Sequence, residues 1–280
     1  MKRYRWWLVG MMFVLLSGVG GVIWVYSDTT TVRVRFFDVG QGDAILISQG
    51  TNQILIDGGR DTKTLLGQLG RAMPFWDRTV EVVILTHPDE DHIGGLLGLE
   101  GRYRVGQWLS SGATTDTATW QHLVPELQPL TEIRKDTKIT LSEGKTLTIL
   151  WPQMDTVLNA KDTNAASIVA RLDLGGKKTF LFTGDLPTTQ ESQVVVAPTD
   201  VLKVGHHGSK YSTSDSWLDN VRPHDAIVSV GANNRYGHPA TEALGRLTQR
   251  HAVIYRTDRQ GAITYTCEVN KEQCQVSTER

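Results

Sequence analysis

The chain has 280 residues, and its 40% hydrophobic content is ordinary for a globular protein with a substantial core. This composition excludes a fibrous or disordered protein. Residues 1–28 hold three of the 29 Lys and Arg residues and one of the 30 Asp and Glu residues, so the remainder carries a net charge of −3. That balance excludes a global basic field that would gather nucleic acid without specificity, and leaves a local basic patch open.

The N-terminal segment differs from the rest of the chain. Three basic residues precede WWLVGMMFVLLSGVGGVIWVY, residues 6–26, an uncharged run long enough to span a bilayer as one helix. We interpret residues 1–28 as an uncleaved single-pass anchor in the cell membrane, with residues 29–280 outside the cytoplasm. A cleaved signal peptide, which would make the protein secreted, is the less favoured alternative. Its apolar core usually has only about 7–15 residues.

After this segment, strand-like and helix-like patterns alternate in two successive groups. The first group has expected strands at 32–39, 44–49, 52–59, 80–86, 106–111, 137–141 and 146–152, and helices at 61–72, 92–99 and 115–128. The second has strands at 167–174, 178–185, 200–205 and 225–231, helices at 187–193, 214–221 and 240–250, and closing strands within 252–276. This order predicts one α+β domain, residues 29–280, with two sheets face to face and helices outside.

Two cysteines, Cys267 and Cys274, flank EVNKEQ in an expected terminal hairpin. Outside the cytosol they could cross-link its two strands. Two buried free thiols are an equally good reading, because the sequence does not give the separation of the two Cα atoms.

The stretch VVILTHPDEDHIGGL, residues 82–96, crowds two imidazoles and two carboxylates into one turn after an apolar run. Pro88 favours an extended backbone at His87, so the strand can run straight into its first candidate ligand. Asp91 and His92 then fall at the expected helix start. Asp91 could simply cap that helix, but capping leaves His87 unexplained.

Two other expected strands also end in groups that bind metals. His206 and His207 follow the strand in LKVGHHGSK, residues 202–210, and KTFLFTGD ends in Asp185. Three strand ends that each present such groups indicate a two-metal site.

The order of these motifs resembles the metallo-β-lactamase superfamily: HPDEDH at 87–92, with ILIDGG before it and FTGD and VLKVGHHGS after it. FFDVGQGDAILI, THPDEDHIGG, LKVGHHGSKYSTS and VSVGANNRYGHP are similar to the metallo-hydrolase domain of ComEC-type DNA-uptake competence proteins. The likeness runs from about Val32 to at least Leu247. It implies a four-layer αββα sandwich, here preceded by one transmembrane helix.

The sequence departs from the general superfamily pattern at two points. Asp89 stands where the motif usually carries a histidine, and DTNAASIVARL, residues 162–172, lacks a further histidine, as in the competence-type relatives. One metal site would therefore be rich in oxygen ligands and could draw on Asn164, and we do not expect β-lactam hydrolysis. The competence proteins also carry a multi-helix channel domain. A chain with one span would need a separate channel partner for DNA uptake.

The resemblance implies two divalent ions, Zn²⁺ or Mn²⁺, that activate water for attack on a phosphodiester. It places His87 and Asp89 on the first metal, Asp91, His92 and His206 on the second, and Asp185 between them. Asp89, Asp91 and Asp185 would be the catalytic carboxylates, with Asp89 as proton acceptor if it is not a ligand.

Other residues receive supporting roles. Asp57, Asp43 and His207 are expected to orient the ligands by hydrogen bonds; Asp43 could equally be a turn residue, and His207 a ligand or a packed histidine. Substrate contacts are expected from Ser209, Lys210, His238 and Asn164, although Ser209 and Lys210 could also belong to an exposed loop.

We therefore expect a membrane-anchored extracytoplasmic phosphodiesterase that acts on DNA. A phosphodiesterase for another ester, such as the phosphocholine of wall polymers, is the alternative enzyme, and the negative charge favours it weakly. A non-catalytic binding module is the third hypothesis. The near-complete ligand set argues against that module. The sequence does not indicate an oligomeric state.

Overall fold

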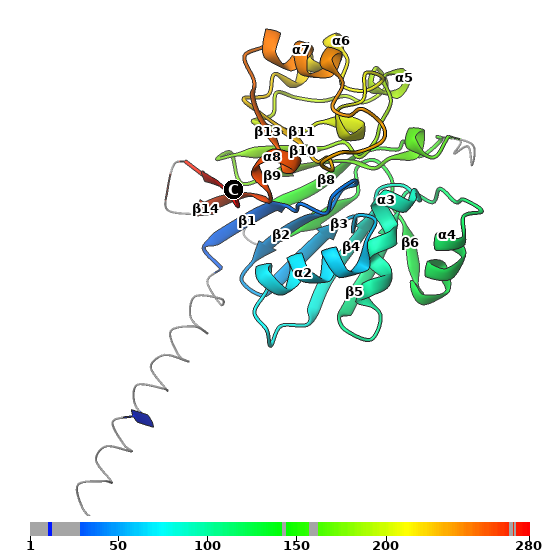
Figure 1. Cartoon of the computed structure of the whole chain (residues 1–280), viewed down its shortest axis with the longest axis vertical. Coiled ribbons are helices and arrows are strands. Elements are labelled where there is room, and N and C mark those ends of the chain that lie inside the picture. The colour runs from blue at the N-terminus through cyan, green and yellow to red at the C-terminus, as the bar shows by residue number, and fades with distance from the viewer. Residues whose placement is uncertain (1–10, 13–28, 142–143, 157–161, 269–270, 272) are drawn as a thin grey trace, which may run out of the picture.

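Figure 1 shows a computed structural model of the chain, in which the sandwich begins at Thr31. The structure describes residues 11–12, 29–141, 144–156, 162–268, 271 and 273–280. No helix among these residues is both long and apolar enough to cross a bilayer. The predicted anchor, residues 1–28, lies outside the described residues except for Met11 and Met12.

The first sheet has the order β15-β14-β1-β2-β3-β4-β5-β6 within the described chain. β1, β2 and β3 form the expected antiparallel meander, and β4, β5 and β6 continue parallel to β3. The C-terminal strands β14 and β15 close the other side, where β14 pairs with β1. The bounds are β1 Thr31–Phe36, β2 Ile45–Gln49, β3 Asn52–Ile56, β4 Thr79–Leu85, β5 Arg104–Ser110, β6 Leu130–Glu132, β14 Ile263–Glu268 and β15 Gln275–Thr278.

The second sheet has the order β13-β12-β11-β10-β9-β8-β7. β7 to β10 are antiparallel neighbours, whereas β10, β11, β12 and β13 are parallel to one another. The bounds are β7 Lys138–Thr140, β8 Thr146–Trp151, β9 Val169–Asp173, β10 Thr179–Phe182, β11 Val201–Lys203, β12 Asp225–Val228 and β13 Val253–Arg256.

Three buried apolar clusters separate four layers. Between the sheets, the ring of Phe36 lies 6.1 Å from that of Phe182 and 6.3 Å from that of Tyr265. A second cluster lies between the first sheet and the helices that cover it, and a third lies between the second sheet and the helices that cover that sheet. The predicted αββα arrangement is therefore confirmed for the described residues, and Figure 1 shows helices on both outer faces.

Short helices cover both sheets. Over the first sheet, α2 begins where the Asp61 side chain accepts from Thr64 N, and buries Leu65 and Leu69, which are four residues apart on one helix face. This covering layer contains α2 Thr62–Ala72, α3 Glu90–Ile93, the 3₁₀ segment η1 Gly94–Leu99, α4 Ala118–Leu123 and η2 Val124–Glu126. The second half of the chain contains η3 Asn164–Ala166, α5 Thr188–Glu191, η4 Gly205–Gly208, α6 Asp215–Val221, α7 Thr241–Gln249 and α8 Thr257–Gln260.

The structure differs from the expected elements where segments are short. The single helix expected at 92–99 is instead α3 followed by η1, and the helix expected at 115–128 is shortened to α4 and η2. β6 and α8 were not predicted, because three or four residues are too few to show a period. Cys267 of β14 and Cys274 form a disulfide. Of the two readings of these cysteines, the cross-link is therefore confirmed and the pair of free thiols is wrong.

Candidate active site

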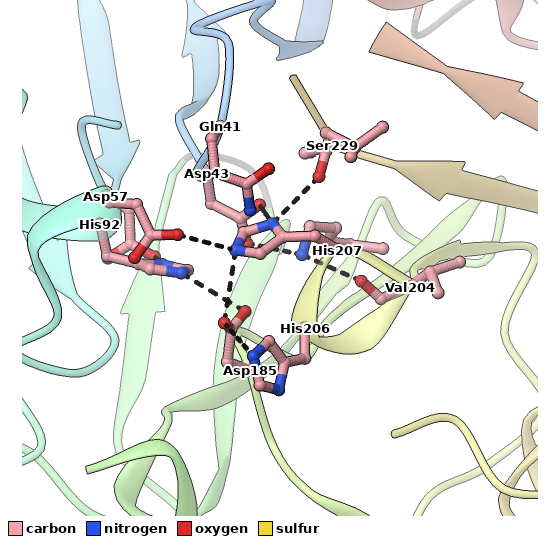
Figure 2. A network of polar contacts seen from close by, with 12 residues as sticks. Gln41, Asp43, Asp57, His92, Asp185, Val204, His206, His207 and Ser229 are labelled. Atoms are coloured by element: carbon pink, nitrogen blue, oxygen red, sulfur yellow. Dashed lines mark hydrogen bonds and ion pairs between the residues drawn. The ribbon is translucent and has the colours of Figure 1, made fainter. Parts of the chain in front are cut away.

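The candidate site lies where strands of both sheets end. Asp57 follows β3, His87 follows β4, Asp185 follows β10 and His207 follows β11. β3 is parallel to β4 and β10 is parallel to β11, so these residues leave each sheet at one edge. The two sheets pack face to face, and Figure 2 shows Asp57, His92, Asp185 and His207 converging on one small volume.

Close backbone packing holds the 87–92 turn in place. A Cβ on Gly42 would lie 1.9 Å from the Asp91 carbonyl oxygen, and one on Gly95 would lie 2.0 Å from the Gly58 carbonyl oxygen. Gly58 N donates to the His92 carbonyl at 2.7 Å. Glycine at these positions therefore lets three loops touch through their main chains.

Asp57 links the ends of β3 and β4 to the turn. Its carboxylate accepts from Thr86 N at 2.8 Å, from Thr86 Oγ1 at 2.7 Å and from His92 Nδ1 at 2.7 Å. The side chain is 1% exposed. With its Nδ1 proton held by Asp57, His92 presents Nε2 to the interior of the site. The hydrogen bond expected between Asp57 and a ligand is thus present, and imidazoles that bind metals typically make such a contact through their other nitrogen.

His87 and Asp185 approach His92 from the two sheets. The rings of His87 and His92 have centroids 4.1 Å apart, and His92 Nε2 lies 3.3 Å from Asp185 Oδ1. Ser167 supports both partners: its hydroxyl accepts from Asp185 N at 3.1 Å and lies 3.3 Å from His87 Nδ1. His87, His92 and Asp185 thereby form one group whose ligand atoms could hold a single ion.

His207 forms a second group with Asp91. Its Nε2 lies 3.3 Å from Asp91 Oδ2 and 3.3 Å from Asp185 Oδ2. Its Nδ1 donates to the carbonyl of Ser229 at 3.0 Å, which directs Nε2 inward. Asp91, His92 and His207 are the corresponding set of potential ligands.

The buried ligand atoms fit divalent cations. Nε2 of His87, Nε2 of His92, Nε2 of His207 and Oδ1 of Asp185 are all buried and make no hydrogen bond of good geometry, although His92 and His207 face Asp185 at 3.3 Å. Four buried polar atoms without such a bond would be strongly unfavourable unless something else satisfies them. Imidazole nitrogens and carboxylate oxygens are suitable ligands for Zn²⁺ or Mn²⁺.

The buried carboxylates of the site also favour a positive charge between them. Burial alone would lower the pKa of His92 and His207, yet both pKa values lie well above the ordinary value because Asp185 and neighbouring carboxylates face them. Burial would raise the pKa of Asp185, but His207 and His92 hold it well below its usual range. A divalent ion would supply the same compensating charge. Burial, followed by the effect of His92, lowers the pKa of His87, which favours the neutral form that binds metal.

The two adjacent histidines lie differently from the expectation. The sequence predicts His206 as the ligand, but its side chain is 29% exposed and its Nε2 lies 3.7 Å from Asp185 Oδ2. His207 is 1% exposed and in contact with both carboxylates. The geometry therefore favours His207 over His206 as a ligand, against the expectation from the sequence. Both residues have positive φ, 50° and 54°, a backbone geometry that no sequence pattern predicted.

Asp89 and Asn164 lie at the more open side of the site. Asp89 Oδ2 is 3.8 Å from His87 Nε2, and its side chain is 39% exposed. The other oxygen accepts from Thr163 Oγ1 at 2.5 Å. Asn164 follows directly, and its buried Oδ1 has no hydrogen-bond partner. These oxygens lie in the region where the sequence lacks the usual histidine.

Asp43 has a partner that sequence reasoning missed. Lys203 Nζ lies 2.6 Å from Asp43 Oδ2, and Asp43 Oδ1 lies 3.4 Å from His207 Nδ1. Asp43 therefore belongs to the site and is more than a turn residue. A lysine inside the apolar strand LKVG was the available signal, since a buried lysine requires a partner.

Of the residues expected to contact substrate, Lys210 and His238 lie at the rim with two exposed tyrosines beside them, whereas Ser209 is buried. Ser209 is 3% exposed, whereas Lys210 is exposed and lies over the ring of Tyr211 at 5.0 Å. The ring of His238 lies 5.7 Å from that of His206 and stacks on Tyr236 at 5.9 Å. Burial and then the neighbouring His206 lower the pKa of His238.

Fold and ligand set together define a class. The chain belongs to the metallo-β-lactamase superfamily: the family described as "Metallo-beta-lactamase superfamily" matches residues 37–232.

Within that class the chain is related to competence proteins, as its motifs predicted. It is 31% identical over 259 residues to ComE operon protein 3 of Bacillus subtilis, and the match covers 83% of this chain and 33% of that protein. It is 29% identical to Competence protein ComA of Neisseria gonorrhoeae, over 83% of this chain and 32% of that protein. Recombination protein 2 of Haemophilus influenzae is 30% identical to it, over 83% of this chain and 28% of that protein. The chain thus spans about a third of the length of these relatives.

Solved structures support the fold. The metallo-β-lactamase fold protein YhfI from Bacillus subtilis matches with a TM-score of 0.56 and 13% identity, over 85% of this chain and all of that one. At this identity the likeness shows the fold alone.

Proposed function

We propose that the protein is a membrane-anchored extracytoplasmic phosphodiesterase that uses two divalent ions to hydrolyse DNA. The observation that carries the proposal is the set of buried Nε2 atoms of His87, His92 and His207, which face Asp185 without hydrogen bonds of good geometry.

Two overlapping sets of residues would hold the ions. We assign His87 and Asp185, with Asp89 beside them, to the first ion, and Asp91 and His207, again with Asp185, to the second. His92 lies within reach of both sets. When bound, two such ions activate water and neutralise the charge that develops on a phosphodiester.

The protein's own groups prepare this site. Asp57 fixes the ring of His92, and Ser229 fixes that of His207, so neither ligand has to be ordered when an ion binds. Thr163 holds Asp89 at the open side, where that carboxylate can accept a proton from the attacking water.

DNA is the favoured phosphodiester because the named relatives are competence and recombination proteins, and because of the rim. Tyr211 and Tyr236 are 66% and 62% exposed, and exposed aromatic rings can stack with the bases of a single strand. Lys210 and Arg235 provide positive charge for phosphate groups close to these rings. A channel protein is the proposed partner for DNA uptake, because the named relatives are competence proteins.

The disulfide supports the extracytoplasmic location. Disulfides form and persist mainly in oxidising compartments, and Cys267 and Cys274 are joined. The 21-residue apolar run at 6–26 provides the proposed anchor.

The test uses the purified full chain in detergent, loaded with Mn²⁺ or Zn²⁺. We expect the protein to cleave single-stranded DNA and the variant Asp185→Asn to lose this activity. Asp219 is an exposed acid of α6, so the control variant Asp219→Asn should keep full activity. Hydrolysis of phosphocholine esters without DNA cleavage would favour the other esterase. Bound metal without turnover of either substrate would indicate a binding module, and full activity of Asp185→Asn would contradict the proposed site.

A further inference from the structure

The connection between α2 and β4, residues 73–78, exposes two aromatic side chains. Phe75 is 79% exposed and Trp76 is 45% exposed. Their rings meet edge to face, with centroids 4.7 Å apart. Aromatic pairs on a surface, especially with tryptophan, are typical of contacts with a partner or a membrane interface. We call residues 73–78 the aromatic loop.

The aromatic loop lies at the opposite end of the first sheet from the active site. It precedes β4, which begins at Thr79, whereas His87 and the turn follow the end of β4. A strand of seven residues is about 23 Å long, so roughly this distance separates the loop from the metal-binding groups.

The same end of the sheet receives the chain from its N-terminal segment. β1 is antiparallel to β2, β2 is antiparallel to β3, and β3 is parallel to β4, so β1 and β4 begin at the same edge. Figure 1 shows the start of β1 and the connection that leads into β4 on this side, away from the convergence of strand ends.

Hydrogen bonds from β2 and β3 reach both the chain before β1 and the aromatic loop. Gln49 Nε2 donates to the Thr29 carbonyl at 2.5 Å, and Gln49 pairs with Asn52 in the β2–β3 hairpin. Gln53 Nε2 in turn donates to Asp77 Oδ2 of the aromatic loop at 3.0 Å. Three strand spacings, about 14 Å, therefore separate the start of β1 from the start of β4.

The length of chain before Thr29 keeps this edge close to the proposed anchor. The apolar run ends at Tyr26, three residues before Thr29, and three residues span at most about 11 Å. The polar headgroup layer of one leaflet is roughly 5–8 Å thick. If residues 6–26 span the bilayer, Thr29 lies at or near the headgroups, and the aromatic loop, about 14 Å away along the same edge, can reach them.

The charges around the aromatic loop suit an anionic surface. Three arginines close to the aromatic loop are exposed, Arg78, Arg102 and Arg104. The acids near them are Glu100, which is exposed, and Asp77 and Glu81, which are half-buried. Arg104 N donates to the Arg78 carbonyl at 2.7 Å, which places these two arginines beside each other. Each basic residue near an anionic bilayer contributes about 1 kcal/mol of attraction.

We infer that Phe75 and Trp76 insert into the headgroup region of the anionic phospholipid bilayer that holds the chain's own N-terminal segment. This contact orients the domain so that its active site faces away from the membrane and is open to a long polymer. The inference rests on the proposed membrane anchor.

The experiment places one thiol-reactive environment-sensitive fluorophore on the full chain. Both native cysteines are joined in a disulfide, so Phe75→Cys introduces a single free thiol. Met154→Cys is the matched control, because Met154 is also 79% exposed and follows β8 at the opposite end of the fold. Each labelled chain is reconstituted into vesicles of phosphatidylglycerol and phosphatidylethanolamine that carry a headgroup nitroxide.

We expect the label at position 75 to be quenched several-fold more strongly by the nitroxide than the label at 154, and to be protected from aqueous iodide. Co-flotation of both chains with the vesicles tests the anchor independently. Flotation with equal iodide access at the two positions overturns the aromatic contact alone. Loss of flotation overturns the anchor and the contact together.

Discussion

Lys203 Nζ lies 2.6 Å from Asp43 Oδ2 in the interior, and neither side chain is more than 2% exposed. Burial would raise the pKa of Asp43, but Lys203, followed by His207, holds that pKa below its usual value. The other carboxylate oxygen lies 3.4 Å from His207 Nδ1. A buried ion pair thus stands directly behind a candidate metal ligand.

This pair should be sensitive to removal of one partner. Lys203→Met leaves the Asp43 carboxylate buried without its counter-charge, and should lower the free energy of unfolding by about 3–5 kcal/mol. Urea unfolding measures this change. The double variant Lys203→Met/Asp43→Asn should regain much of the loss, since it buries no charge. A single variant as stable as the wild type would show that the pair is not held as described.

The two histidines after β11 should differ in metal binding. His207→Ala removes an inward Nε2 that lies 3.3 Å from both Asp91 and Asp185, so one ion should be lost or bound at least about tenfold more weakly. His206→Ala should retain more of the bound metal. Metal analysis and calorimetric titration of both variants decide the order, and a larger loss in His206→Ala would reverse our assignment.

Asp57 should act through His92. Asp57→Ala removes the acceptor for His92 Nδ1 and for Thr86, and should weaken metal binding by about 10–100-fold. Asp61→Asn is the control, because an asparagine N-cap serves α2 nearly as well as aspartate. Equal metal affinity in both variants would exclude an orienting role for Asp57.

Two glycines should respond oppositely to alanine. A Cβ on Gly95 would lie 2.0 Å from the Gly58 carbonyl oxygen, so Gly95→Ala must displace the loop that carries Asp57 and should both destabilise the fold and weaken metal binding. Gly245, inside α7, has open space around it. Gly245→Ala should raise the free energy of unfolding by about 0.5–1 kcal/mol. Thermal unfolding of both variants tests the contrast, which would fail if Gly95→Ala matched the wild type.

The cross-link in the C-terminal hairpin should contribute to stability. Cys267→Ala/Cys274→Ala releases a short loop in the unfolded chain, and should lower the free energy of unfolding by roughly 2–3 kcal/mol. The comparison is made by urea unfolding under oxidising conditions. Unchanged stability would show that the hairpin is held by its strand pairing alone.

Much of the fold was readable in the sequence because its signals are local. Apolar runs predicted β4, β10 and β11 within one to three residues at each end, and the groups after them indicated where metal ligands would gather. Short elements such as β6 and α8 left no such signal. The glycine-dependent break between α3 and η1 was also missed, because it depends on the approach of the Gly58 main chain.

The sequence alone determined which residues stand at strand ends, since strand periodicity and turn residues act over a few positions. Tertiary structure decided which of those residues face one another. The inward direction of His207 over His206, the hold of Asp57 on His92 and the pairing of Lys203 with Asp43 each join segments that are distant in the chain. Such contacts depend on how two sheets pack and where backbones turn left-handed, and neither is specified by local pattern.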